Sequence, residues 1–320
     1  MKAQGWVTLL LAGLFAASLL LPWGPLSDIY SRDPALGQAV LVELRLPRAL
    51  LACAYGAMLG AAGAAVQALF ANPLASPDLT GTTSGAALGA VIVAYLFGFA
   101  SPLAHALGAV AGATGALLLL LALAGPRAES ATLLLAGLAI SALAGALTTL
   151  ALALAPSPFA FYDAYQWLLG SLVDRSLGQA LGASLPALLV IVLLLRFARP
   201  LDNLALGEEV AQSLGYDIDR LRLRIVCLSA IGVGACVAVC GAIGFIGLVA
   251  PIFARRLTRG HPGRAILPAA LLGAALLLAA DLITREAPLG RVLPIGVVTA
   301  LLGAPLFLWL VVRMRWRLAR

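Results

Sequence analysis

Ten long apolar stretches dominate this chain and restrict what it can fold into. Each approaches the roughly 20 residues that a helix needs to cross a bilayer, and Pro, Gly or charged residues separate them. Of the 320 residues, 62% are hydrophobic and 11% are charged, whereas a soluble domain carries about 25% charged residues. We therefore predict an all-α polytopic membrane protein, a single transmembrane domain over residues 1–320. The predicted spans are 5–23, 49–70, 82–100, 103–124, 131–155, 179–196, 223–240, 242–257, 265–283 and 294–312.

The first predicted span resembles a signal peptide, but its apolar stretch is longer than a typical one and no clean cleavage site follows, so we interpret it as a retained span. The eighth is barely separated from the seventh, by Cys240-Gly241. Several spans are short and rich in Gly, which favours close approach of helices.

The distribution of Lys and Arg predicts the orientation of the chain. With ten spans and the N-terminus inside, 15 of the 21 basic residues fall on one side. Both termini are therefore expected in the cytoplasm. This asymmetry accounts for most of the net charge of +7, so no nucleic-acid partner is expected.

One hydrophilic loop, about 197–222, is long enough to have structure of its own, and it is predicted to be cytoplasmic. Asp202 or Asn203 is suited to cap a short helix, with Glu208-Glu209 in its early part, and Gly215 is suited to end it. Its apolar side would consist of Leu204, Leu206, Ala211 and Leu214. Such a helix either docks a soluble partner or lies on the membrane interface, and the spacing favours neither.

The chain shows no catalytic or metal-binding pattern. It has no phosphate-binding loop, so any ATPase must be another chain, and ATP and Mg²⁺ would bind there rather than here. Asp281 is the clear ionisable residue within a span, and Arg285, four residues on, is expected to pair with it. The four cysteines suggest packing rather than a disulfide or metal site. A secondary transporter that needs no ATPase, or a membrane enzyme, remains an alternative.

The run from Arg45 to Gly85 is unusual for a membrane segment. It opens with RLPR, crosses a Gly/Ala-rich helix and ends with NPLASPD, whose two prolines interrupt any helix. The run at 72–78 is either a helix-breaking turn or a stiff constriction at the cytoplasmic mouth that holds Asn72 and Leu74 in place.

This run resembles the signature of the FecCD-type permeases, the membrane subunits of type II ABC importers for ferric siderophores, haem and cobalamin. Further similarities occur in the same order along the chain: LALGEEVAQSLG (204–215), CGAIGFIGLVAPIFARRL (240–257), LLGAALLLAADLITR (271–285) and LPIGVVTALLGAPLFLWLV (293–311). The resemblance implies the fold of these permeases, and a homodimer with a path between the copies. It also implies two cytoplasmic ATPase subunits, a periplasmic or surface binding protein, and a place in the bacterial cytoplasmic membrane.

The resemblance also implies roles for particular residues. Arg45, Arg48 and Arg285 match positions that meet acidic residues of the binding protein. The turn of Leu206, Gly207, Glu208 and Glu209 matches the contact with the ATPase. Asn72 and Leu74 match a cytoplasmic gate, and a short loop at Ser130-Ala131 matches a second gate element, although its side chains differ from the family's. An iron chelate, either siderophore or haem, is the expected cargo because such systems are more numerous, and cobalamin is the alternative.

Overall fold

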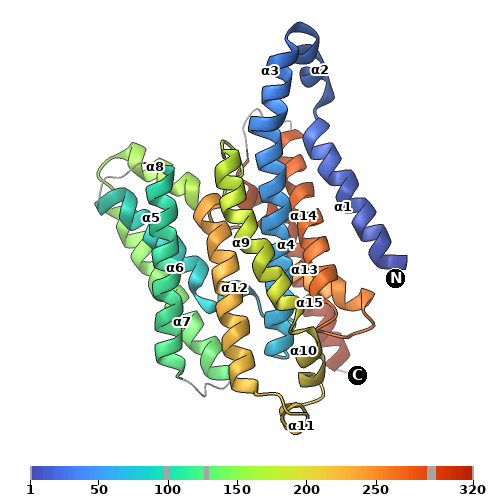
Figure 1. Cartoon of the computed structure of the whole chain (residues 1–320). Coiled ribbons are helices and arrows are strands. Elements are labelled where there is room, and N and C mark those ends of the chain that lie inside the picture. Colours follow the sequence, from blue (N-terminus) through green and yellow to red (C-terminus); the bar gives the residue numbers. More distant parts are fainter. Residues whose placement is uncertain (1, 97–100, 126–129, 287–292, 319–320) are drawn as a thin grey trace.

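The computed structural model describes residues 2–96, 101–125, 130–286 and 293–318, and every regular element in them is helical (Figure 1). The first half contains α1 (Lys2–Leu20), α2 (Trp23–Arg32), α3 (Pro34–Ala39), the π-helix η1 (Val40–Arg45), α4 (Leu46–Leu69), the short 3₁₀ helix η2 (Pro77–Thr80), α5 (Thr82–Leu96), α6 (Pro102–Ala124) and α7 (Ser130–Ala153). The second half contains α8 (Pro158–Leu168), α9 (Leu177–Leu195), α10 (Ala198–Leu204), α11 (Glu208–Ser213), α12 (Ile218–Cys240), α13 (Ile246–Leu257), α14 (Ile266–Glu286) and α15 (Ile295–Leu318).

Each of the ten predicted spans coincides with one helix of the structure. They are α1, α4, α5, α6, α7, α9, α12, α13, α14 and α15. Six helices in the described ranges are long and apolar enough to cross a membrane by themselves, and a seventh span forms if α1 and α2, bent by 51°, count as one. The helix from Ile246 starts four residues later than predicted, because residues 241–244 adopt no helix and Gly241 has a left-handed φ of +74°.

The second span begins much earlier than predicted. Helix α3, the π-helix η1 and α4 run on without a break from Pro34, where the sequence suggested a start near residue 49. With α2 they form a hairpin that projects beyond the rest of the bundle (Figure 1). Asp33 begins it: its carboxylate accepts hydrogen bonds from the backbone N–H groups of Ala35 and Leu36.

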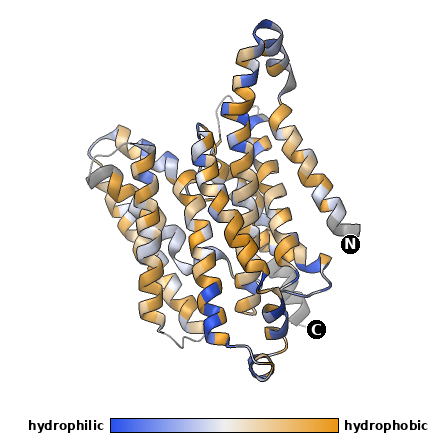
Figure 2. Ribbon diagram, in the orientation of Figure 1, coloured by the Kyte–Doolittle hydropathy of each residue, from blue (hydrophilic) through white to orange (hydrophobic). Residues whose placement is uncertain are grey.

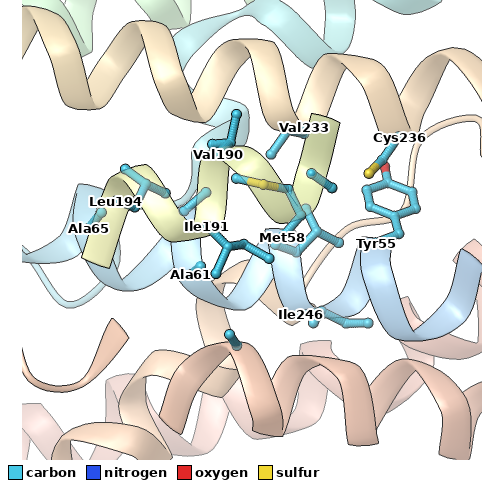
Figure 3. Close-up of a cluster of buried hydrophobic side chains, with 14 of the residues drawn as sticks. Tyr55, Met58, Ala61, Ala65, Val190, Ile191, Leu194, Val233, Cys236 and Ile246 are labelled. Carbon is cyan, nitrogen blue, oxygen red and sulfur yellow. The ribbon is translucent and has the colours of Figure 1, made fainter. Parts of the chain in front are cut away.

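Helix α4 forms the centre of the bundle and packs against α9, α12, α13 and α14 (Figures 1 and 3). Its glycines allow this approach. A Cβ on Gly60 would collide with the carbonyl of Ala269 in α14, and a Cβ on Gly63 would collide with the carbonyl of Gly247 in α13. Close approach through Gly was predicted, and it is confirmed here. The remaining core is filled by side chains such as Met58 and Ile191 (Figure 3).

Polar residues gather at the two ends of the bundle, and the middle is mostly apolar (Figure 2). One polar end carries α10, α11 and the start of α12, and the other carries α2, α3 and α8 (Figures 1 and 2). The excess of Lys and Arg assigns the first end to the cytoplasm and the second to the outside.

Candidate functional site

The three arginines at the outer end form one cluster with Asp281. The Nε of Arg48 lies 2.8 Å from Asp281 Oδ1, and the Nη2 of Arg285 lies 2.6 Å from Asp281 Oδ2. Arg285 also donates to the carbonyl of Ser18, at 2.7 Å, and Arg45 donates to the carbonyl of Leu19, at 2.8 Å. The cluster therefore ties together α1, η1, α4 and α14.

Burial distinguishes the members of this outer cluster. The Asp281 side chain is 1% exposed, and those of Arg48 and Arg285 are 18% and 10% exposed. Arg45 has no ion-pair partner in the part of the chain that the structure describes. Two guanidinium groups therefore share one carboxylate, Arg45 lies beside them without one, and the cluster keeps an excess of positive charge. The predicted Asp281–Arg285 pair is confirmed, but Arg48, from a helix more than 200 residues away, was not foreseen as a partner.

The cytoplasmic loop folds into two short helices, α10 and α11, rather than one. The predicted cap was wrong: Asp202 accepts a hydrogen bond from the N–H of Gly263, at 2.8 Å, and lies 3.6 Å from Arg264. Helix α11 instead starts after Gly207, whose φ of +117° favours glycine. The predicted end at Gly215 is confirmed, since it follows α11 with a φ of +87°.

A buried arginine anchors α11 to the membrane-spanning α12. Arg222 is 9% exposed, forms an ion pair with Glu208 and lies 3.5 Å from Asp219. This links the first residue of α11 to a helix that crosses the bundle. Sequence spacing did not reveal it, because Arg222 and Glu208 lie on different helices.

The apolar residues of this loop do not share one side, as the sequence had suggested. Leu204 and Ala211 are buried, whereas Leu206 and Leu214 are 67% and 57% exposed. With Val210, 43% exposed, these two give the loop three exposed apolar side chains, of which Leu206 precedes α11. Leu206, Val210 and Leu214 are four residues apart in sequence, and we call them the loop stripe.

The NPLASPD run does more than end α4. Asn72 Oδ1 accepts a hydrogen bond from the N–H of Leu74, at 2.9 Å, which stabilises a turn below α4. The chain then turns back into the interior of the bundle. A Cβ on Gly247 would lie 2.9 Å from Pro77 and 3.1 Å from the carbonyl of Leu59. Since Leu59 lies ten residues before the end of α4, Pro77 sits about 15 Å above that end.

This re-entrant segment carries a carboxylate that the sequence analysis assigned to a loop. Asp78 Oδ1 accepts a hydrogen bond from Thr83 Oγ1 at 2.9 Å, beside the N-terminus of α5. Ser141, in the middle of α7, donates to the carbonyl of Asp78 at 3.4 Å. A carboxylate is stabilised at the start of a helix by the helix dipole. Asp281 is therefore not alone among acidic residues inside the bundle.

The second gate element differs from its prediction. Ser130 and Ala131 are the first residues of α7 rather than a loop. Residues 126–129, which precede them, lie outside the described ranges.

The outer segment that follows α7 packs over the ends of other helices. Helix α8 ends near Gly170, and the N–H of Ser171 donates to the carbonyl of Cys240 at 2.8 Å. The N–H of Gly296, at the start of α15, donates to the carbonyl of Leu169 at 3.2 Å. Helix α8 is thereby joined to the outer ends of α12 and α15.

Comparison with known proteins identifies the family. The FecCD transport family model matches residues 6–313. A vitamin B12 import system permease of Vibrio cholerae is 43% identical over 98% of this chain and 96% of its own. The Fe(3+) dicitrate transport system permease FecD of Escherichia coli is 38% identical over 97% and 98%. The hemin transport system permease HmuU of Yersinia pestis is 40% identical over 86% and 84%.

A solved structure agrees in fold as well as in sequence. It is an inward-facing conformation of a putative metal-chelate type ABC transporter, 32% identical, with a TM-score of 0.86 over 98% of this chain and 99% of that one. The agreement therefore extends over nearly the whole of both chains. This chain therefore belongs to the FecCD transport family and is a multi-pass membrane permease of a bacterial ABC importer for iron chelates, haem or cobalamin, with ATP hydrolysis carried by a separate subunit.

Proposed function

We propose that this permease imports cobalamin, as one of two copies that enclose a path between them. The 43% identity to a vitamin B12 permease, over nearly the whole of both chains, carries this proposal. A ferric siderophore or haem is the second candidate, which the similarity to the Fe(3+) dicitrate and hemin permeases favours. The bundle offers few charged groups, which suits a bulky chelate that must be passed on rather than held.

The cargo is tested with purified permease in vesicles, together with its ATPase and its binding protein. Cobalamin, a ferric siderophore and haem are supplied separately, and uptake and ATP hydrolysis are measured. We expect cobalamin to raise both rates. A response to haem or to the siderophore alone would replace the first candidate by the second, and uptake without the ATPase would contradict an ABC mechanism.

We assign the contact with the ATPase to Leu206, Gly207, Glu208 and Glu209. The loop stripe supports this, because an apolar surface at the cytoplasmic tip is suited to a protein partner. The ion pair of Glu208 with Arg222 gives movement of α11 a direct route into α12. ATP binding would close the two ATPases and shift α12 through this pair.

Leu206→Asp is a clean test of this contact, since Leu206 is exposed and packs little in the free permease. We expect ATP hydrolysis that no longer drives uptake, in a permease that purifies normally. Gly207→Trp should act in the same way, and normal transport by both variants would disprove the assignment. Arg220→Gln, at an exposed ion pair on α12, serves as the matched control.

We assign docking of the binding protein to Arg45, Arg48 and Arg285. The excess positive charge of the outer cluster is complementary to carboxylates, which arginine binds through its planar fork. Arg45 gives the sharpest test, because its hydrogen bonds go to backbone carbonyls and its loss leaves no carboxylate unpaired. We expect Arg45→Gln to weaken binding of the binding protein about tenfold, the effect of roughly 1.4 kcal/mol. Unchanged affinity, with Arg32→Gln as control, would exclude Arg45 from the contact.

We assign the cytoplasmic gate to Asn72, Leu74, Ser130 and Ala131, with Leu74 facing its counterpart in the second copy. The test is Leu74→Cys in a background where the two partly exposed cysteines, Cys53 and Cys227, are Ala. An oxidised cross-link between copies should block uptake, and reduction should restore it. Absence of any cross-link in every nucleotide state would contradict this placement.

A further inference from the structure

A cavity of about 670 Å³ lies away from the sites described above, at the outer ends of α6, α8, α9 and α12. Helix α12 packs against both α6 and α9 and forms the floor with small residues such as Ala235 and Ala238. The walls are apolar and include Leu107 of α6 and Pro186 of α9. Its volume is within the roughly 300–1,000 Å³ of ligand sites.

The cavity has a polar end with buried nitrogen atoms that lack hydrogen-bond partners. His105, Arg175 and Gln179 line it there, with Trp167 beside them. The Nε of Arg175 and the Nε2 of His105 are buried without a hydrogen-bond partner in the described part of the chain. Arg175 forms no ion pair within those residues either. A buried N–H group without an acceptor is costly.

The position of the cavity places it in the outer half of the membrane. Along α6 its lining runs from Leu103 to Val110, a rise of about 10 Å, and half of the hydrocarbon layer is about 15 Å thick. Leu103 is 70% exposed and Leu107 is 61% exposed, so the rim on α6 faces lipid. Trp167 lies at the polar end, where amphipathic rings meet the headgroups.

We propose that this cavity binds one anionic phospholipid of the outer leaflet. Its phosphate accepts hydrogen bonds from the guanidinium of Arg175 and from His105 in the tautomer protonated at Nε2, and one acyl chain lies along α12 between α6 and α9. Basic pockets between membrane helices are suited to lipid headgroups. A phospholipid has an anionic headgroup at one end and hydrocarbon along the rest. This matches the cavity, which has polar residues at one end and apolar walls elsewhere. The proposal is independent of which chelate the permease carries.

The experiment measures lipid retained by the full-length protein. The permease is purified from nanodiscs that contain phosphatidylglycerol and phosphatidylcholine, and bound lipid is counted by native mass spectrometry. Wild type should keep one phosphatidylglycerol in preference to phosphatidylcholine. Arg175→Gln should lower its retention about tenfold, the loss of one charge-assisted hydrogen bond. Gly182→Leu should do the same by filling the cavity, since a Cβ there meets no atom within 4 Å and the fold is spared.

Two matched variants lie outside the cavity. Gly115→Leu adds the same side chain at an open position on a different helix, α6, and Arg32→Gln removes an outer arginine from the projecting hairpin. Both should retain lipid as wild type does. The proposal is overturned if wild type keeps no phosphatidylglycerol, or keeps phosphatidylcholine equally well. It is also overturned if Gly182→Leu retains the lipid while its thermal unfolding shows that the variant is folded. Competitive displacement of the lipid by the chelate cargo would overturn it as well.

Discussion

Asp281 allows the strongest prediction about stability. Its two carboxylate oxygens serve different arginines, with Oδ1 facing Arg48 and Oδ2 facing Arg285. Asp281→Asn replaces one oxygen by an NH₂ group of the same size. Whichever way the amide turns, one guanidinium then faces a donor instead of an acceptor.

The magnitude follows from burial. Breaking a buried ion pair by removal of one partner costs about 3–5 kcal/mol. We expect about 3 kcal/mol for Asp281→Asn, at the lower end, because Arg48 is 18% exposed and the amide still accepts one hydrogen bond. The measurement is the free energy of unfolding in mixed micelles with increasing SDS.

A second variant separates charge from packing. Asp281→Asn combined with Arg285→Gln removes the unpaired guanidinium as well, so the double variant should recover part of the loss. Thr284→Val keeps the carboxylate but removes two hydrogen bonds, one that Thr284 donates to the backbone carbonyl of Asp281 and one that it accepts from Arg48, so it should cost about 1–2 kcal/mol. A loss below about 1 kcal/mol for Asp281→Asn would refute the view that this carboxylate holds the outer ends of α4 and α14 together.

Three further substitutions probe other contacts, the first two by the same unfolding measurement and the third by proteolysis. Gly60→Ala should cost roughly 1–3 kcal/mol by overpacking, whereas Gly115→Ala, with open space around it, should not destabilise; equal effects would contradict the packing of α4 on α14. Tyr55→Phe should cost about 1–2 kcal/mol, because its buried hydroxyl bonds two backbone groups near the start of α13, and Tyr162→Phe at an exposed site is the control. Asp202→Ala should loosen the cytoplasmic loop, seen as faster proteolysis there, and unchanged cleavage would contradict its link to Gly263.

The sequence alone determined the lipid surroundings, the membrane-spanning stretches and their order, and its Lys and Arg residues predicted their orientation. These properties depend on hydrophobicity and charge summed over short stretches, so they can be obtained without knowing which segments meet. The pairing of Asp281 with Arg285 belongs here as well, because four residues along a helix always bring two side chains to one face. The same reasoning failed at Pro34, because Gln38, Glu43 and Arg45 interrupt the apolar pattern while the helix continues through them.

Only the tertiary structure decided which distant residues share a contact. Arg48 reaches Asp281 across α4 and α14, and Arg222 reaches Glu208 across a turn of the cytoplasmic loop. The return of Asp78 into the bundle was hidden as well, because two prolines predict a break but not where the chain goes next. The cavity around Arg175 likewise depends on four helices that lie together only in the folded protein. The local pattern of hydrophobic and charged residues specifies the helices, and close packing through glycine specifies which helices are in contact.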